Sequence, residues 1–217
     1  MKIIPCILVC FFGLHSSGSY AQKKISDFSI VYDYEISNGT GASKPVTGSN
    51  AIFVKGSLSR FETGNQSYSS SIIHDATTGN TVILKEVSGQ KILIRLTLQN
   101  WKQMNANDEA LIFSNTNETK TIAGYKCIRA TAKTKDGSEY AVYFTGDLSV
   151  DNTDYAPQFK NLAGLALEYE ITKGDFKIKY TVSKLNLNPV PESRFDIPKT
   201  GYREMTFEES KKLNFAK

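Results

Sequence analysis

His74 and Asp75 are the neighbouring residues best suited to acid–base chemistry in this sequence. A histidine beside an aspartate could serve a Ser-His-Asp triad, in which the imidazole takes the proton of the serine hydroxyl. The chain has many serines but no G-x-S-x-G nucleophile elbow to present one. We therefore interpret His74 as a surface histidine in a turn.

The thiol of Cys127 could act as a nucleophile with His74 as its base. No protease-like signature surrounds this cysteine, and Tyr125-Lys126-Cys127 is typical of a strand. The other two cysteines, Cys6 and Cys10, lie in the first 21 residues, so Cys127 has no later partner for an intramolecular disulfide. A free cysteine is usually a small buried hydrophobic residue, and we expect that role here.

Asp147, Asp151 and Asp154 could offer oxygen ligands to calcium. Their spacing lacks the EF-hand pattern and its glycine, so we expect a solvated loop. After residue 21 the sequence has one histidine and one cysteine, which cannot build a tetrahedral nitrogen–sulfur metal site. No phosphate-binding glycine loop occurs either. The sequence therefore predicts no metal site and no cofactor.

Residues 1–21 have the layout of a secretory signal peptide. Lys2 precedes an apolar run, and Ser19-Tyr20-Ala21 is a small-x-small cleavage site. The apolar run is too short to span a bilayer, which takes about 20 residues. We expect cleavage after Ala21 and export to the periplasm or the cell exterior. Neither leader cysteine follows the small residue that lipid attachment requires, so we expect a freely soluble product.

Length and charge exclude several protein classes. The chain has 217 residues, and the 196 that follow residue 21 suit a single β-rich domain over residues 22–217. Its formal net charge of +4 is spread along the chain, without the basic stripe of a nucleic-acid binder. No second long apolar run appears, so we expect no membrane-spanning segment.

Alternation of apolar and polar residues predicts most of the secondary structure. Phe28, Ile30, Tyr32, Tyr34 and Ile36 share one face of the first strand. Asp-Gly at residues 136–137 predicts a tight hairpin. The same reasoning predicts further strands at residues 52–61, 68–73, 82–84, 92–98, 110–113, 125–134, 139–145, 165–171 and 176–182.

Two short helices and an arm complete the expected elements. Leu98, Trp101 and Met104 lie three residues apart, which favours a short helix that docks one apolar edge. Three prolines between residues 189 and 198 predict an extended arm. Thr206 and Glu209 form a capping-box pattern for a short terminal helix.

A flat sheet of nine or ten such strands would leave its apolar face in water. We therefore expect a mainly β (α+β) fold: a strongly curved antiparallel sheet or half-barrel, with two or three short helices on its concave side.

The sequence also resembles a family. Ile122-Ala-Gly-Tyr-Lys-Cys127, Tyr140–Thr145 and Pro157–Glu168 resemble segments of the GLPGLI-type secreted proteins of Bacteroidetes and a related domain-of-unknown-function family. The resemblance spans about Phe28 to Phe207, and it departs from the family at residues 162–165, where the family has Gly-Leu-Pro-Gly. It implies a fold similar to periplasmic lipoprotein carriers. The family has no established activity, so it implies no catalytic residues.

Three functions remain open. The first is a non-enzymatic, exported binding protein of the cell envelope that holds an apolar or lipid-like ligand in the curve of its sheet. The apolar segment Leu162–Leu167 supports this hypothesis, although ordinary core would look the same. The second is a structural or interaction module of a surface assembly, and the third is a hydrolase using Cys127 or His74. The candidate ligand-binding residues are Tyr125, Tyr143, Phe144 and Phe159.

Overall fold

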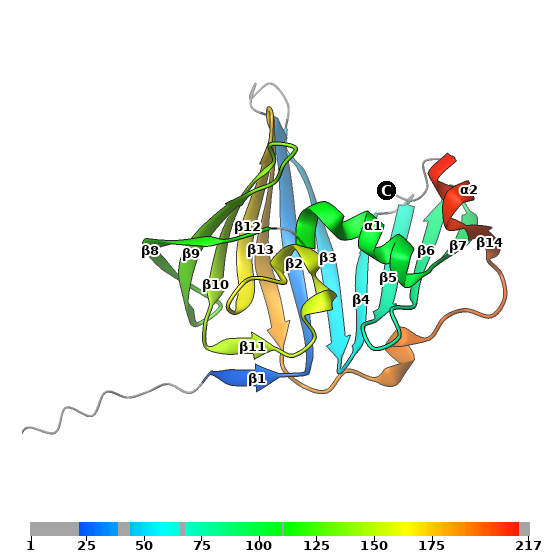
Figure 1. The fold of residues 1–217 in the computed structure, drawn as a ribbon, viewed down its shortest axis with the longest axis horizontal. Helices are drawn as coiled ribbons and strands as arrows, with labels where there is room; N and C mark the ends of the chain where they lie inside the picture. Colours follow the sequence, from blue (N-terminus) through cyan, green and yellow to red (C-terminus); the bar gives the residue numbers. More distant parts are fainter. Residues whose placement is uncertain (1–21, 39–43, 66–67, 110, 213–217) are drawn as a thin grey trace, which may run out of the picture.

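The computed structural model describes residues 22–38, 44–65, 68–109 and 111–212. The predicted signal peptide lies outside these ranges. The described residues confirm a mainly β fold, in which two α-helices, α1 (Leu98–Glu109) and α2 (Phe207–Lys212), accompany the strands (Figure 1). The strands are β1 Lys23–Ile25, β2 Asp27–Asn38, β3 Val46–Lys55, β4 Leu58–Gly64, β5 Tyr68–Asp75, β6 Thr81–Val87, β7 Gln90–Leu96, β8 Ser114–Ile122, β9 Tyr125–Lys133, β10 Glu139–Thr145, β11 Leu148–Val150, β12 Leu165–Lys173, β13 Phe176–Asn186 and β14 Arg203–Thr206.

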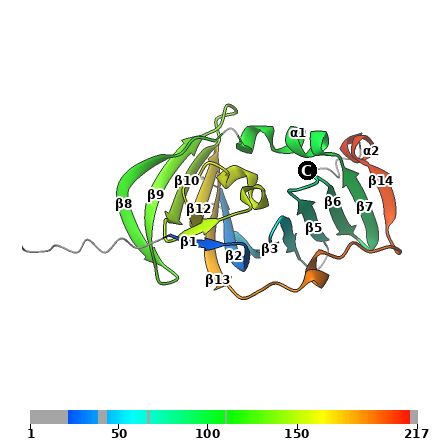
Figure 2. The same ribbon diagram turned by 60° about the horizontal axis from the view of Figure 1, so that its bottom comes forward.

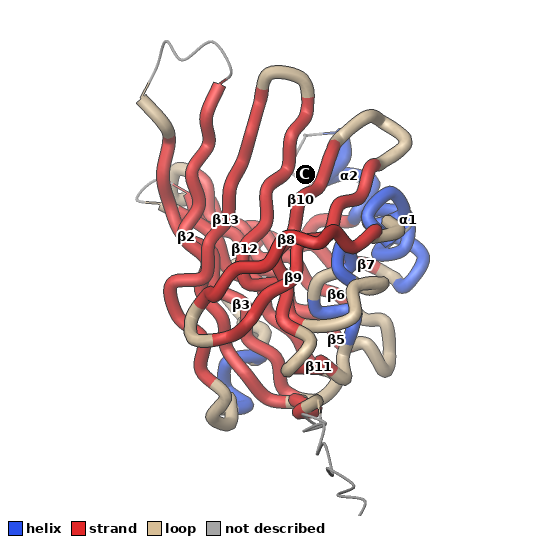
Figure 3. Tube along the Cα trace, turned by 90° about the vertical axis from the view of Figure 1, so that its left-hand side faces the viewer, coloured by secondary structure: helices blue, strands red, loops and turns tan. Residues whose placement is uncertain are grey.

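Twelve of these strands form one sheet in the order β14-β7-β6-β5-β4-β3-β2-β13-β12-β10-β9-β8. The sheet bends along its width (Figure 2) and ends in two edge strands, β14 and β8, so it does not close on itself. Figure 3 views the molecule from the β8 edge. Most neighbours are antiparallel, as expected, but β14 pairs with β7 in parallel. The short β1 and β11 form a separate parallel pair.

One side of the sheet contacts α1 and α2. We call it the helix-bearing face, and it carries the row Ile30, Ile52, Phe61, Ile72, Ile83 and Ile94. Met104 of α1 and Phe207 of α2 pack against the β6–β7 end of this row. Short 3₁₀ turns, η1 (Thr153–Tyr155) and η2 (Pro157–Phe159), complete the main core near β2 and β12. There Tyr155 meets Phe28 edge-on at 5.5 Å.

The C-terminal arm covers the opposite face of β4 to β7. It includes the 3₁₀ turn η3 (Glu192–Phe195), and it buries Val190 and Phe195 against a second cluster that contains Ile73, Val82 and Leu93. The side chain of Arg60 donates to the backbone carbonyl of Arg194 at 2.8 Å. Since helices cover one face and the arm covers the other, β6 is buried on both sides from Thr81 to Lys85.

Two predicted strands differ from the structure. The strand expected over residues 52–61 is two strands, because Gly56 takes a positive φ of 54° and turns the chain between Lys55 and Leu58. The strand expected at residues 110–113 is wrong over residues 111–113, which form no strand, and residue 110 lies outside the described residues. The next strand, β8, begins at Ser114 and is almost wholly polar and exposed, so it has no apolar alternation to reveal it.

Both predicted helices are confirmed. In α1, Trp101 is buried, but Leu98 remains 46% exposed, so the docked edge is narrower than expected. In the capping box of α2, Glu209 accepts from the backbone N–H of Thr206 at 2.8 Å. The Thr206 hydroxyl accepts from the backbone N–H of Glu209 at 3.2 Å, so two otherwise unpaired donors are satisfied.

Candidate functional site

The helix-bearing face of β3 to β6 consists of an apolar row between two polar rows. Strand pairing places the side chains of the apolar row directly opposite one another. One flanking row runs across Asn50, Thr63, Ser70 and Lys85. The other runs across Ser59, His74 and Thr81. Apart from Thr63, every residue of the two polar rows is buried.

The apolar row is not fully covered. Ile52 and Ile83 are buried, whereas Phe61 and Ile72 between them are only partly buried, as is Met104 of α1 above this face. Water therefore reaches apolar side chains in the middle of the face. We call Phe61, Thr63, Ile72 and Met104 the open stretch.

Aromatic rings continue this face across β2, β13 and β12. Tyr34 contacts Tyr180 with ring centroids 5.8 Å apart, and Tyr180 stacks on Tyr169 at 4.4 Å. Tyr169 in turn meets Phe159 edge-on at 4.9 Å. Tyr34 lies over Gly48, where any Cβ would clash with the tyrosine ring. These rings lead from partly exposed Tyr34 and Tyr180 into the buried core.

His74 is buried, so its interpretation as a surface residue is wrong. Its side chain is 2% exposed, because it lies on the helix-bearing face together with Ser70 and Ile72 and Trp101 covers it. The Nδ1 atom lies 2.8 Å from the Thr81 hydroxyl, while Nε2 is buried with no hydrogen-bond partner among the described residues. Burial lowers the pKa of His74, which favours the neutral imidazole.

The four predicted ligand-binding residues are only partly brought together. Phe144 and Phe159 both belong to the main core, at 3% and 6% exposure. Phe159 also lines a pocket of 170 Å³ with Val150, Tyr155, Leu162 and others. A cavity of about this size can hold a group such as benzene.

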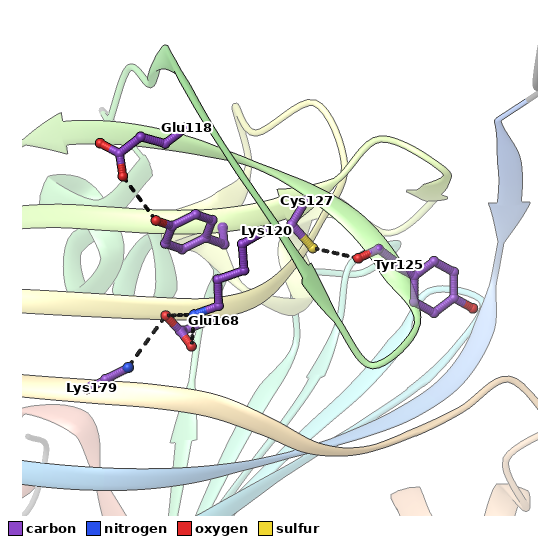
Figure 4. Close-up of polar contacts among 7 residues, drawn as sticks. Glu118, Lys120, Tyr125, Cys127, Glu168 and Lys179 are labelled. Carbon is purple, nitrogen blue, oxygen red and sulfur yellow. Dashed lines mark hydrogen bonds and ion pairs between the residues drawn. The ribbon is translucent and has the colours of Figure 1, made fainter.

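Tyr125 and Tyr143 lie outside the part of the core that holds Phe144 and Phe159. Tyr143 pairs across the sheet with Glu168 and Arg129, on the face opposite Val142 and the aromatic rings. Its hydroxyl donates to Glu118 at 3.1 Å. Tyr125 is partly buried at the margin of the main core, and Figure 4 shows its ring directed away from Lys120 and Glu168.

Cys127 has the expected structural environment. Its side chain is fully buried, and burial raises the pKa of the thiol to about 11, so the thiol is protonated at neutral pH. In the sheet, β4, β3, β2, β13, β12 and β10 separate the Cys127 strand from the His74 strand. The structure therefore does not bring these two residues together as a nucleophile and its base.

The three aspartates do not form a shared site. Asp151 pairs with Lys24 at 2.7 Å, and Asp154 pairs with Lys160 at 3.0 Å. Within the described ranges, no group of three or more acidic, histidine or cysteine side chains could hold a metal ion. None of the helices in those ranges has the length and apolar character needed to cross a membrane.

Sequence reasoning missed Tyr34, Tyr169, Tyr180 and Lys85 as candidate site residues. The sequence pattern could have identified the tyrosines, because each lies among the apolar residues that alternate with polar ones along its strand. Lys85 carried none, because a lysine after Val82, Ile83 and Leu84 looks like the exposed end of a strand.

No protein-family model matches the sequence, and no curated protein matches it. The resemblance to GLPGLI-type proteins therefore stays a prediction. Solved structures are similar in fold. PNGF-II superposes with a TM-score of 0.51 and 12% identity over 85% of this chain, which spans about a third (32%) of that protein. An uncharacterized conserved protein from Thermus thermophilus has a TM-score of 0.51 and 7% identity, covering 83% of this chain and 90% of that one. A LolA superfamily protein from Nitrosomonas europaea has a TM-score of 0.37 and 8% identity, covering 81% and 92%.

Proposed function

We propose that this protein is an exported, non-enzymatic binding protein that holds an apolar or lipid-like ligand against its helix-bearing face. In this proposal the helix-bearing face is the concave side of the bent sheet, and the helices lie within the curve. One observation carries the proposal: Phe61 and Ile72 are partly exposed in the middle of an otherwise buried apolar row. Covering such a surface with an acyl chain gains about 25 cal/mol per Å² of apolar area removed from water.

The aromatic rings give the ligand a continuous path. Tyr34 and Tyr180 are partly exposed, and their ring contacts lead toward Tyr169 and Phe159. Aromatic side chains supply large apolar areas with little rotamer freedom to lose. Phe159 is thereby the predicted ligand-binding residue nearest to this path.

The test uses Trp101, the single tryptophan, as a fluorescence reporter beside the open stretch. Titration of the purified protein with palmitate and 1-hexadecanol should change the Trp101 emission and saturate. Phe61→Gln and Tyr180→Ala should each weaken binding about tenfold, since each removes roughly 1.5 kcal/mol of apolar contact. Phe176→Ala is the matched control, because Phe176 is 60% exposed on the same strand as Tyr180. No saturable response to either probe would refute the proposal.

Export is part of the same proposal. Cleavage after Ala21 would leave Gln22 at the start of the mature chain. Intact-mass measurement of the protein recovered from the producing cells tests this. A chain that retains residues 1–21 in the secreted or periplasmic fraction would contradict it.

A second function, an interaction module, is favoured by the β8 edge. β8 is exposed along most of its length, and the neighbouring Ile112 is 79% exposed. An open edge strand can accept a strand from another chain. Crosslinking in cells should then capture one partner through β8, and Thr119→Pro should abolish that capture because proline cannot support strand pairing.

A further inference from the structure

Two ring nitrogens of one aromatic stack on the helix-bearing face are buried without a hydrogen-bond partner. They are Nε2 of His74 on β5 and Nε1 of Trp101 on α1, and neither has a partner among the described residues. The two rings are stacked with centroids 4.2 Å apart. A buried polar atom that lacks a partner costs free energy, which a hydrogen bond to a ligand would recover.

The contacts of His74 indicate which of its nitrogens carries the hydrogen. The Thr81 hydroxyl donates to the backbone carbonyl of Gly79 at 3.5 Å, so it accepts from Nδ1 of His74, which lies 2.8 Å away. In a neutral imidazole, one nitrogen carries a hydrogen and the other a lone pair. Nε2 of His74 is therefore an acceptor, whereas Nε1–H of Trp101 is a donor.

An uncharged hydroxyl group matches this acceptor and donor. A hydroxyl has a hydrogen to donate and lone pairs to accept with, whereas an ether or a carboxylate has no hydrogen to donate. Charge also disfavours a carboxylate here. Burial lowers the pKa of His74, and the carboxylates of Asp154 and Asp75 partly oppose this shift. The field of these two carboxylates therefore reaches the His74 ring and repels a second anion.

The stack adjoins the open stretch. His74 lies two residues beyond Ile72 on the same face of β5, a separation of about 7 Å. Trp101 lies three residues before Met104, so these two side chains are neighbours on the surface of α1. Ile72 and Met104 are only partly buried. An apolar chain that covers them therefore has one end beside the stack.

We propose that the ligand is a long alkyl or acyl chain with an uncharged hydroxyl head group. The hydroxyl donates to Nε2 of His74 and accepts from Nε1–H of Trp101, while the chain lies over Ile72 and Phe61. This inference rests on the proposed function and narrows its ligand class. The head group is identified by the acceptor and donor that the stack leaves unpaired, and the chain by the open stretch. A long-chain alcohol and a monoacylglycerol share this chemistry.

The experiment compares head groups on one chain length, with Trp101 fluorescence as the readout. 1-Hexadecanol should bind about tenfold more tightly than 1-methoxyhexadecane, because the methyl ether has no hydrogen to donate. It should also bind about tenfold more tightly than palmitate at about pH 7.5, where palmitate is ionised. 1-Monopalmitoylglycerol distinguishes the two sources of the hydroxyl: tighter binding than 1-hexadecanol assigns a monoacylglycerol, and weaker binding assigns an alcohol.

His74→Phe tests the assignment to the imidazole. Phenylalanine keeps an aromatic ring against Trp101 but offers no acceptor, so the preference for the alcohol over the ether should fall to about twofold or less. Leu98→Ala is the matched control and should retain the preference, because Leu98 belongs to the same helix as Trp101 and is 46% exposed. A preference that persists in His74→Phe, or that is lost equally in both variants, would overturn the role of Nε2.

A second readout uses the unmodified protein and does not depend on the folding of a variant. The nitrogen-15 resonance of Nε2 in His74 should shift on addition of 1-hexadecanol and stay unchanged with the ether. Equal binding of alcohol and ether without such a shift would overturn the hydroxyl head group but leave the proposed function intact. Tighter binding of palmitate would overturn the uncharged head group. If none of these probes binds saturably, the proposed function itself is refuted.

Discussion

The indole of Trp101 lies flat on the imidazole of His74, with ring centroids 4.2 Å apart and planes 15° apart. This stack joins α1 to β5. It is the point at which a helix of largely polar composition is fixed to the sheet, because Trp101 is the one residue of α1 that is buried among those described. The position of α1 above the open stretch therefore depends on this contact.

Trp101→Ala should destabilise the fold strongly. Replacement of a buried tryptophan by alanine removes apolar contacts and leaves a cavity, which costs about 3–5 kcal/mol. Leu98→Ala in the same helix should cost less than about 1 kcal/mol, because Leu98 is 46% exposed. Urea unfolding followed by far-UV circular dichroism measures both values. Similar losses in the two variants would show that the stack does not anchor α1.

Stability should fall as the pH drops through the ordinary pKa of histidine. Burial lowers the pKa of His74 in the folded state. As the pH falls, His74 of the unfolded chain therefore binds a proton before His74 of the folded protein does, and this proton binding stabilises the unfolded state. The contribution of neutral His74 is complete above about pH 6.5 and is lost progressively below that value. Asp108 acts in the opposite direction at lower pH, because burial raises its pKa.

Urea unfolding of the chain beginning at Gln22, measured between about pH 7.5 and pH 5.5, checks this dependence. His74→Gln should flatten the curve in this range. A slope that is unchanged in His74→Gln would assign the pH dependence to other groups.

Cys127 should react slowly with thiol reagents in the folded protein. Its side chain is fully buried and its pKa is raised to about 11, so both access and thiolate population are low at pH 8. The absorbance of the thionitrobenzoate that is released on labelling should rise slowly in buffer and at once in denaturing urea. Rapid labelling of the native protein would contradict the structural role of this thiol.

Glu168 should contribute more to the free energy of unfolding than the other acidic residues of its sheet. Its side chain is 10% exposed and lies 2.7 Å from Lys120 and 3.6 Å from Lys179 (Figure 4). Glu168→Gln leaves two lysines without their shared carboxylate, and we expect a loss of about 1–2 kcal/mol.

The matched control is Glu139→Gln. The Glu139–Lys133 pair is 61% and 64% exposed, so its loss should cost less than about 0.5 kcal/mol. Thermal unfolding at low and high salt compares the two variants. Equal losses would mean that the Glu168 pair is screened by solvent as fully as the exposed pair.

Local pattern was sufficient for most strands and for both helix positions. Tyr32, Tyr34 and Ile36 alternate with polar residues, and a strand is the only element that places such residues on one face. Thr206 and Glu209 predicted a helix start because their hydrogen bonds are local. Gly56 was missed because the residues on both sides of it keep the same alternation.

The candidate site could be predicted only in part. The sequence showed that the aromatic residues of β2 share one face. Phe144 and Phe159, however, are packed inside the main core. Tyr143 points to the other face of the sheet, because side chains alternate along β10. His74 and Lys85 looked exposed because each follows the apolar centre of its strand. Their burial comes from α1, α2 and the neighbouring strands, which a local reading does not include.

The sequence by itself determined the β-rich class, the phase of each alternating strand and the capped terminal helix, because these depend on residues close together in the chain. Only the tertiary structure decided that Asn50, Ser70 and Lys85 form one polar row beside Phe61 and Ile72. The register of strand pairing brings these side chains together, and register depends on the packing of whole strands against one another and against the helices.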